Sequence, residues 1–102
     1  MLRASTVTLI GESPNAHGVF EAATETRTTA YCIETHVRQA NVAVCDAQGL
    51  TCEHVIRLAV ASEYTGQRRA VYGGTEYTIA GTYRDGAHEW IDLTLGRGNA
   101  DA

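Results

Sequence analysis

Residues Val71–Ile79, with the sequence VYGGTEYTI, decide the fold class of this chain. On both sides of Gly73-Gly74 the residues alternate in polarity and include β-branched and aromatic types, which is typical of strands. A glycine pair supplies the positive φ angles that a two-residue hairpin turn requires. The stretch therefore predicts an antiparallel hairpin, with Arg68–Tyr72 as its first strand and Thr75–Arg84 as its second.

The second strand of this hairpin contains a glycine in an apolar row. A period of two places Tyr77, Ile79 and Tyr83 on one face, with Gly81 in the same row. Glycine within a strand marks a bulge or a bend. We therefore expect the regular alternation to be disturbed near Gly81.

Period-two patterns predict further strands on both sides of the hairpin. Asp85-Gly86 is a second turn signal, and the strand after it should place Ile91, Leu93 and Leu95 inward. The additional predicted strands are Thr6–Ile10, Thr24–Val37, Cys52–Val60 and Glu89–Leu95.

Arg38–Gln48 differs from the rest of the chain because its apolar residues have helical spacing. Ala40, Val44 and Ala47 fall on one side, and Gly49 stands where a helix C-terminal glycine is expected. A short helix is predicted here. Its small apolar residues bury less surface than leucines would, and they would allow another chain to approach closely.

Gly11–Ala23 is predicted to be a loop of thirteen residues, which is long for a compact domain. Ordering such a loop costs roughly 1 to 2 kcal/mol per residue in backbone entropy, so contacts must offset this cost if the loop is fixed. We expect a contact or gating element. Its candidate residues are Glu12, Ser13, Pro14, Asn15, His17 and Phe20.

The whole chain, residues 1–102, is expected to form one domain, with Gly96–Ala102 as a flexible tail. About six short strands and one helix predict a mainly β fold, a small antiparallel barrel or sandwich, because closure removes exposed sheet edges. No apolar run approaches the roughly 20 residues of a membrane helix, and the start lacks a secretory signal. We therefore expect no membrane association and an intracellular place of synthesis.

The charge pattern favours protein partners over nucleic acid. The formal net charge is −4, and all eight basic residues are arginines. Nucleic-acid-binding proteins usually carry a basic excess, whereas arginine is well suited to carboxylates at protein interfaces. An all-arginine set can equally reflect a GC-rich genome. The arginines expected at an interface are Arg38, Arg68, Arg69 and Arg84.

No motif for catalysis or phosphate binding is present, so we expect no enzymatic activity and no cofactor. Five residues could be metal ligands: Cys32, His36, Cys45, Cys52 and His54. Residues four apart on a strand are separated by roughly 13 Å, and the spacings do not match a zinc knuckle. Burial of the cysteines as small apolar side chains is the favoured interpretation, with no disulfide framework.

Four aromatic residues gather in the last strands: Tyr72, Tyr77, Tyr83 and Trp90. They could stack bases, as in an oligonucleotide-binding barrel. Without a basic groove, core or subunit-interface positions explain them more simply.

Several segments resemble the head closure proteins of tailed bacteriophages, also called head-tail joining, stopper or minor capsid proteins. The resemblance rests on Gly49–Leu58, Glu63–Gln67, Val71–Ile79, Gly81–Arg84 and Trp90–Leu95, and the opening segments Val7–Glu12 and Thr24–Arg27 are also similar. Two positions depart from the pattern. Gln67 replaces a glutamate, and Gln39-Ala40-Asn41 replaces an acidic and aromatic helix start.

The resemblance implies a structural β-barrel subunit of the virion, assembled in the bacterial cytoplasm. It implies a ring of six or twelve copies below the portal and adaptor proteins, which closes the DNA exit channel and docks the tail proteins. Channel DNA would pass without sequence-specific binding. The alternatives are an oligonucleotide-binding β-barrel module and, less favoured, a small metal-dependent enzyme.

Overall fold

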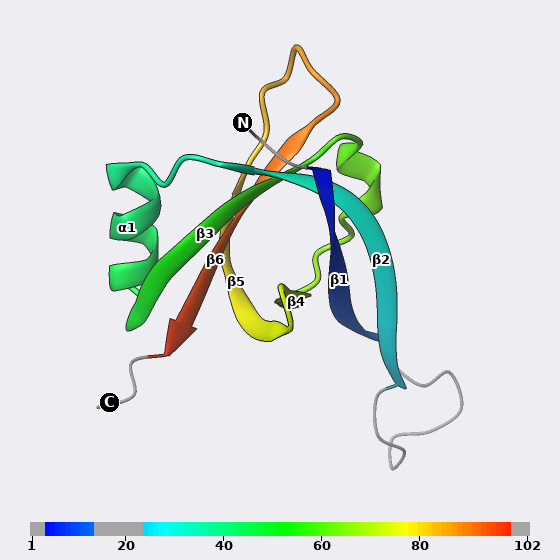
Figure 1. The fold of residues 1–102 in the computed structure, drawn as a ribbon, viewed down its shortest axis with the longest axis horizontal. Coiled ribbons are helices and arrows are strands. Elements are labelled where there is room, and N and C mark those ends of the chain that lie inside the picture. The colour runs from blue at the N-terminus through cyan, green and yellow to red at the C-terminus, as the bar shows by residue number, and fades with distance from the viewer. Residues whose placement is uncertain (1–3, 14–23, 99–102) are drawn as a thin grey trace.

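The computed structural model describes residues 4–13 and 24–98. Its strands are antiparallel and close into a barrel in the order β1-β2-β3-β6-β5-β4 (Figure 1). This confirms the mainly β fold class with six strands and one short helix. The elements are β1 (Ala4–Ser13), β2 (Thr24–Thr35), α1 (Gln39–Asp46), β3 (Leu50–Leu58), the 3-10 helix η1 (Ala61–Glu63), β4 (Arg69–Tyr72), β5 (Thr75–Tyr83) and β6 (Ile91–Gly98).

Alternate residues of the strands fill the barrel interior. Ile91, Leu93 and Leu95 of β6 are buried, as the sequence predicts. Fully burying a leucine or isoleucine stabilises a fold by roughly 1.5 to 3 kcal/mol, so these side chains account for much of the stability. The largest fully buried members of the central cluster are Leu9, Ile56, Leu58, Leu93 and Leu95.

The β4–β5 hairpin has the predicted turn. Gly73 and Gly74 have φ angles of 61° and 82°, and Tyr72 pairs directly with Thr75 across the turn. Positive φ at both central positions matches the twist of the flanking strands.

β5 contains a bulge. Ile79 pairs with Leu95 of β6, but the next pair joins Gly81 to Thr94, so Ala80 is an extra residue on β5. The disturbance expected near Gly81 is therefore confirmed.

The bulge reverses which side of β5 faces inward. Tyr77 and Ile79, before the bulge, are buried in the barrel, whereas Tyr83, after it, is exposed and pairs with Asp92. The prediction that all three apolar residues share one face is wrong for Tyr83. The reason is that one inserted residue shifts the period-two alternation by one position.

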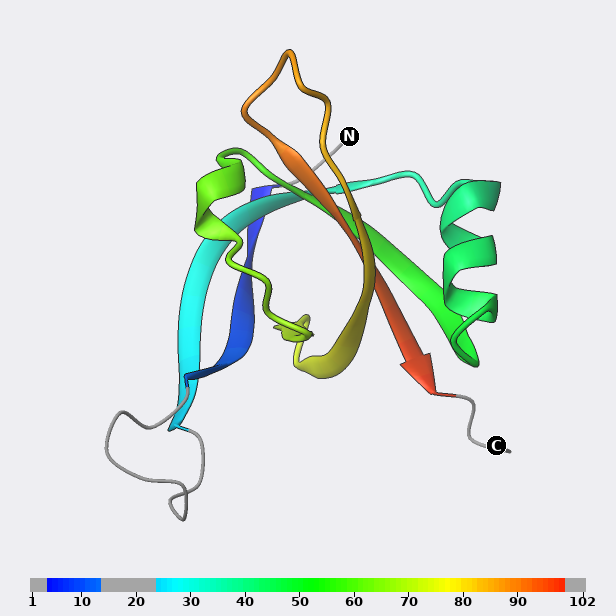
Figure 2. The same ribbon diagram turned by 180° about the vertical axis from the view of Figure 1, so that it is seen from behind.

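α1 lies outside the barrel, against β3, β5 and β6 (Figures 1 and 2). The side chain of Asn41 donates a 2.9 Å hydrogen bond to Thr94 Oγ1, and that of Gln48 donates a 2.7 Å bond to the Ala80 carbonyl. Cys45, between them on the helix, is completely buried. The helix is thus attached by Asn41, Cys45 and Gln48, which recur every three to four residues.

Both ends of α1 match local signals in the sequence. Asn41 Oδ1 accepts a 2.9 Å hydrogen bond from the Arg38 backbone N–H, which caps the first turn. Gly49 has a φ of 72° just after the helix, as expected for a C-terminal glycine. Asn41, one of the departures from the head-closure pattern, therefore both caps the helix and attaches it to β6.

The predicted loop Gly11–Ala23 begins too early. β1 continues to Ser13 and pairs with β2 as far as Ser13 opposite Thr24, so Glu12 and Ser13 are strand residues. The partner strand supplies hydrogen bonds that a single segment of sequence does not reveal. The remaining loop candidates, Pro14, Asn15, His17 and Phe20, lie outside the described residues.

The predicted tail also begins too early, because β6 extends to Gly98. Gly96 is buried and lies under α1, where an added Cβ would stand 3.0 Å from Cys45 Sγ. The absence of a side chain on Gly96 permits close packing of the helix on the strand. Residues 99–102 of the predicted tail lie outside the described residues.

Replacing Gly74 with valine should destabilise the domain by about 1 kcal/mol or more, because a β-branched residue is strained at a φ of 82°. Chemical denaturation of the wild type and variant measures the effect. Gly86→Val is the matched control, since Gly86 has no positive φ and no atom near an added Cβ. Equal decreases in the free energy of unfolding for the two variants would contradict the turn assignment.

Candidate interface on the outer face of the barrel

α1 covers only part of the outer face of the barrel. Beneath the helix, Val55 of β3 pairs with Thr94 of β6, and both are buried. Next to Thr94, an added Cβ on Gly81 would stand 3.0 Å from Val44 Cγ1 of the helix. The helix therefore packs closely on this row of residues.

Another row crosses the outer face without such a cover. Ile33 of β2, Arg57 of β3, Asp92 of β6 and Tyr83 of β5 are successive partners across the four strands, and we call them the outer row. Tyr83 is 60% exposed, and Tyr31, two residues before Ile33 on the same face of β2, is 76% exposed. Grouped apolar side chains with this exposure are typical of protein-binding surfaces.

The centre of the outer row is a charged pair with fixed geometry. Arg57 Nε and Nη2 donate hydrogen bonds of 2.7 and 3.1 Å to the two carboxylate oxygens of Asp92. These bonds raise the pKa of Arg57 above its ordinary value, although partial burial acts against them. The two bonds therefore fix the guanidinium of β3 beside the carboxylate of β6.

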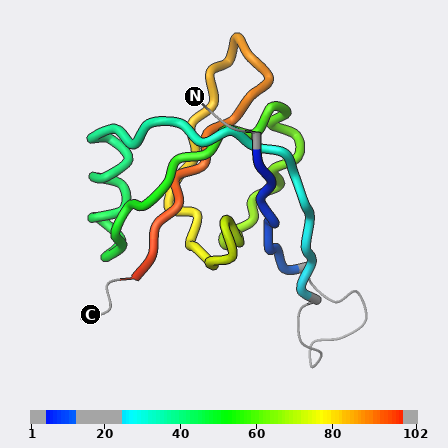
Figure 3. Tube along the Cα trace, viewed as in Figure 1, coloured from blue at the N-terminus to red at the C-terminus, as the bar shows by residue number. Residues whose placement is uncertain are grey.

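Trp90 packs against the Arg57 guanidinium of this pair. Its ring centroid is 3.7 Å from Arg57 Cζ, which is a cation–π contact, and the Tyr83 and His88 rings lie 5.9 and 5.8 Å from it. The loop that carries His88 and Trp90 projects beyond the barrel (Figure 3). Its outer part is ordered by Asp85, which accepts a 2.9 Å bond from the Ala87 N–H and lies 3.1 Å from His88 Nδ1.

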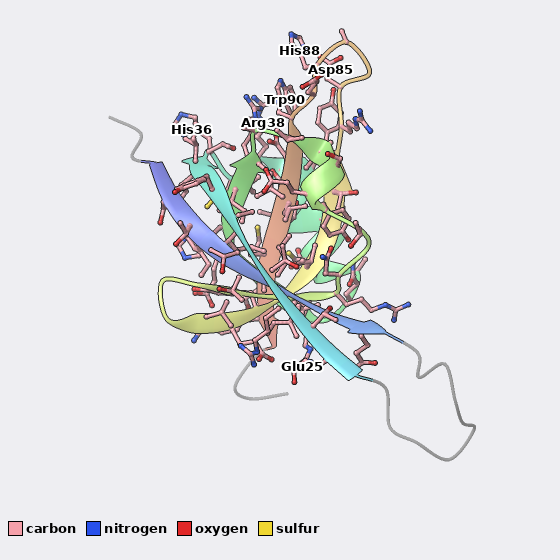
Figure 4. All side chains as sticks on the ribbon, turned by 90° about the vertical axis from the view of Figure 1, so that its right-hand side faces the viewer. Glu25, His36, Arg38, Asp85, His88 and Trp90 are labelled. Atoms are coloured by element: carbon pink, nitrogen blue, oxygen red, sulfur yellow. The ribbon has the colours of Figure 1, made fainter. Side chains whose placement is uncertain are left out.

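A groove of about 510 Å³ lies between this loop and the start of α1. Tyr83, Trp90 and the Arg57–Asp92 pair line one side, and His36 and Arg38 belong to the segment leading into the helix. Figure 4 shows His36, Arg38 and Trp90 together at one end of the barrel, with Glu25 at the opposite end.

Three of the four predicted interface arginines form no ion pair with any described residue. They are Arg38, Arg68 and Arg84, whereas Arg69 lies 3.4 Å from Glu76. Arg38 lines the groove, and Arg84 directly follows Tyr83 of the outer row. Arg68 and Arg69 lie elsewhere, in a second cavity of about 800 Å³ that Glu12 also lines. The predicted set therefore divides between two surfaces.

A polar network connects three strands in another part of the barrel. Tyr72 donates a 2.8 Å hydrogen bond to Glu34 Oε1, and His54 Nδ1 lies 3.1 Å from Glu34 Oε2. Partial burial would raise the pKa of Glu34, but the bonds from Tyr72 and His54 outweigh it, so this pKa lies below its ordinary value. Burial and the bond to Glu34 raise the pKa of Tyr72 to about 12. The network therefore ties β2, β3 and β4 through an ionised carboxylate.

Cys32 and Cys45 have the properties of buried thiols. Burial, reinforced by nearby Glu34, raises the pKa of Cys32 to about 11, and burial is also the main cause that raises the pKa of Cys45 to about 11. A protonated thiol is a poor nucleophile and a poor metal ligand. Among residues 4–13 and 24–98, no three His, Cys, Asp or Glu side chains are grouped in a way that could hold a metal ion.

The four aromatic residues that the sequence placed in one group belong to two environments. Tyr77 is buried in the core and Tyr72 packs against it, whereas Tyr83 and Trp90 lie on the outer face. The Arg57–Asp92 pair was not predicted. The outward position of Arg57 follows from its place between Ile56 and Leu58, but the partnership with Asp92 depends on strand register.

Comparison with protein-family models gives no match, and comparison with curated proteins gives none either. No helix in the described part of the chain is long and apolar enough to cross a membrane. The site must therefore be interpreted from its own geometry and from the resemblance noted in the sequence.

Replacing Tyr72 with phenylalanine should raise the pKa of Glu34, because the variant lacks the phenolic donor that stabilises the carboxylate. Because the pKa of Glu34 is lowered in the folded protein, its ionised carboxylate stabilises the fold at pH values above the ordinary glutamate pKa of 4.5. This stabilisation is lost as the pH falls through the folded-state pKa of Glu34. NMR titration of the Glu34 carboxyl carbon measures the shift. Tyr31→Phe is the control, and equal Glu34 titrations in all three proteins would contradict the network.

Proposed function

We propose that this chain is a structural subunit of the head-tail connector of a tailed bacteriophage. It forms a ring of six or twelve copies below the portal and adaptor proteins, closes the DNA exit channel and docks the tail. The resemblance of Gly49–Leu58, Val71–Ile79 and Trp90–Leu95 to head closure proteins supports this role. A small closed barrel with an outer row that α1 does not cover is consistent with it.

The observation that carries the proposal is the composition of the groove. Trp, Tyr and Arg dominate the energetics of protein interfaces, and here Trp90 contacts both Arg57 and Tyr83 on the outer face. The Arg57–Asp92 bonds and the ordered loop fix these side chains before binding. A preorganised surface of this kind binds a protein partner with less loss of side-chain entropy.

A protein partner fits the groove better than an oligonucleotide does. Base stacking needs open aromatic faces, but Arg57 covers one face of the Trp90 ring and is itself bonded to Asp92. The net charge of −4 further favours passage of DNA through the connector without tight binding.

The proposal predicts that the chain is a component of virions. Mass spectrometry of purified particles should detect it, and deleting its gene should give heads that leak DNA or fail to bind tails. Wild-type protein should restore infectious particles. Tyr83→Ser should restore them poorly while keeping its melting temperature, since Tyr83 is 60% exposed.

Full infectivity after deletion, or absence of the chain from virions, would overturn this function. Salt-dependent binding of single-stranded DNA by the purified protein would instead favour the oligonucleotide-binding module.

A further inference from the structure

The two charged residues at the ends of α1 have the wrong sign for the helix. Arg38 immediately precedes the first helical residue, and Asp46 is the last one. The N-terminal end of a helix carries partial positive charge and the C-terminal end partial negative charge, so both positions are electrostatically unfavourable. Neither side chain forms an ion pair with a described residue.

The outward side of α1 is small and apolar between these charges. Asn41, Cys45 and Gln48 face the barrel, and Val42 and Ala43 are exposed on the remaining surface. Val42 and Ala43 lie within one turn of Asp46, so one short surface combines apolar contact area with an unpaired carboxylate.

The groove has the complementary properties. Tyr83 and Trp90 supply apolar surface, and Arg38 supplies an unpaired guanidinium. The groove lies at the N-terminal end of α1, whereas the surface formed by Val42, Ala43 and Asp46 lies toward its C-terminal end. The two surfaces share no residue, because Val42, Ala43 and Asp46 do not line the groove.

We infer that the groove of one copy receives the C-terminal half of α1 from a second copy, with Asp46 of the second copy paired to Arg38 of the first. The contact also brings together helix ends of opposite partial charge. This inference rests on the proposed function and names the contact between neighbouring subunits. Two different surfaces meet, so the contact is heterologous and generates a ring when the rotation closes.

Charge reversal tests the contact in the full chain. R38E and D46R should each weaken self-association about tenfold or more, because like charges then face each other. An equimolar mixture of the two variants should associate like the wild type, since every contact in an alternating assembly again joins opposite charges. Analytical ultracentrifugation over a concentration series measures all three samples.

Matched controls use Arg68 and Glu63, which form no ion pair within the described part of the chain and belong neither to the groove nor to α1. R68E and E63R should associate like the wild type. If self-association is too weak for ultracentrifugation, cross-linking tests the same contact. R38C mixed with D46C under copper-phenanthroline oxidation should give a disulfide-linked heterodimer. R68C mixed with D46C should not give a disulfide-linked heterodimer. Wild-type protein oxidised in the same way measures the background of cross-linking through Cys52.

The outcomes separate this contact from the connector role. If R38E and D46R associate like the wild type, or their mixture fails to recover association, or the R38C–D46C link does not form, the contact is overturned. The connector role would then stand on virion composition and gene deletion. If the chain is absent from virions but the charge-reversal pattern holds, the connector role fails and the contact remains as a homo-oligomer interface.

Discussion

Closure of the barrel through β4 is the constraint on which the rest of the structure depends. Each of its four residues, Arg69–Tyr72, pairs with β1 on one side and β5 on the other. Without β4, two long strands would become edges that can pair with other chains. Inside this seam Ala70 lies between Leu9 and Tyr77, and all three are buried. The small alanine leaves room for the tyrosine ring, so packing and closure support each other.

The closed barrel also explains how an exposed surface can be rigid. Arg57 and Asp92 lie on strands whose opposite faces carry Ile56, Leu58 and Leu93, which are fully buried. Interior packing therefore fixes the backbone positions from which the outer pair is presented. The groove is formed by these strands, the start of α1 and a short loop, so its shape does not depend on a long flexible segment.

The sequence predicted correctly the turns and helix end that depend on neighbouring residues. It predicted wrongly the features that depend on a partner strand distant in the sequence. The Gly73-Gly74 turn and the helix ended by Gly49 depend on backbone preferences of nearby residues, and both are present. The extent of β1 and β6 depends on partner strands, so both strands continue past their predicted ends. For the same reason the sequence did not connect Arg57 with Asp92 and Trp90.

The bulge at Ala80 means that the number of residues in β5 determines which side chains reach the surface. Tyr77 and Tyr83 are six positions apart, an even spacing that would put both on one face of a regular strand, yet they lie on opposite sides of the barrel wall. Losing the extra residue would restore regular pairing and turn the aromatic ring toward the interior. For the evolution of this chain, a change in length within β5 is therefore a more drastic event than most changes of residue type. Substitutions can change the chemistry of the outer row, but the number of residues in β5 determines whether Tyr83 belongs to it.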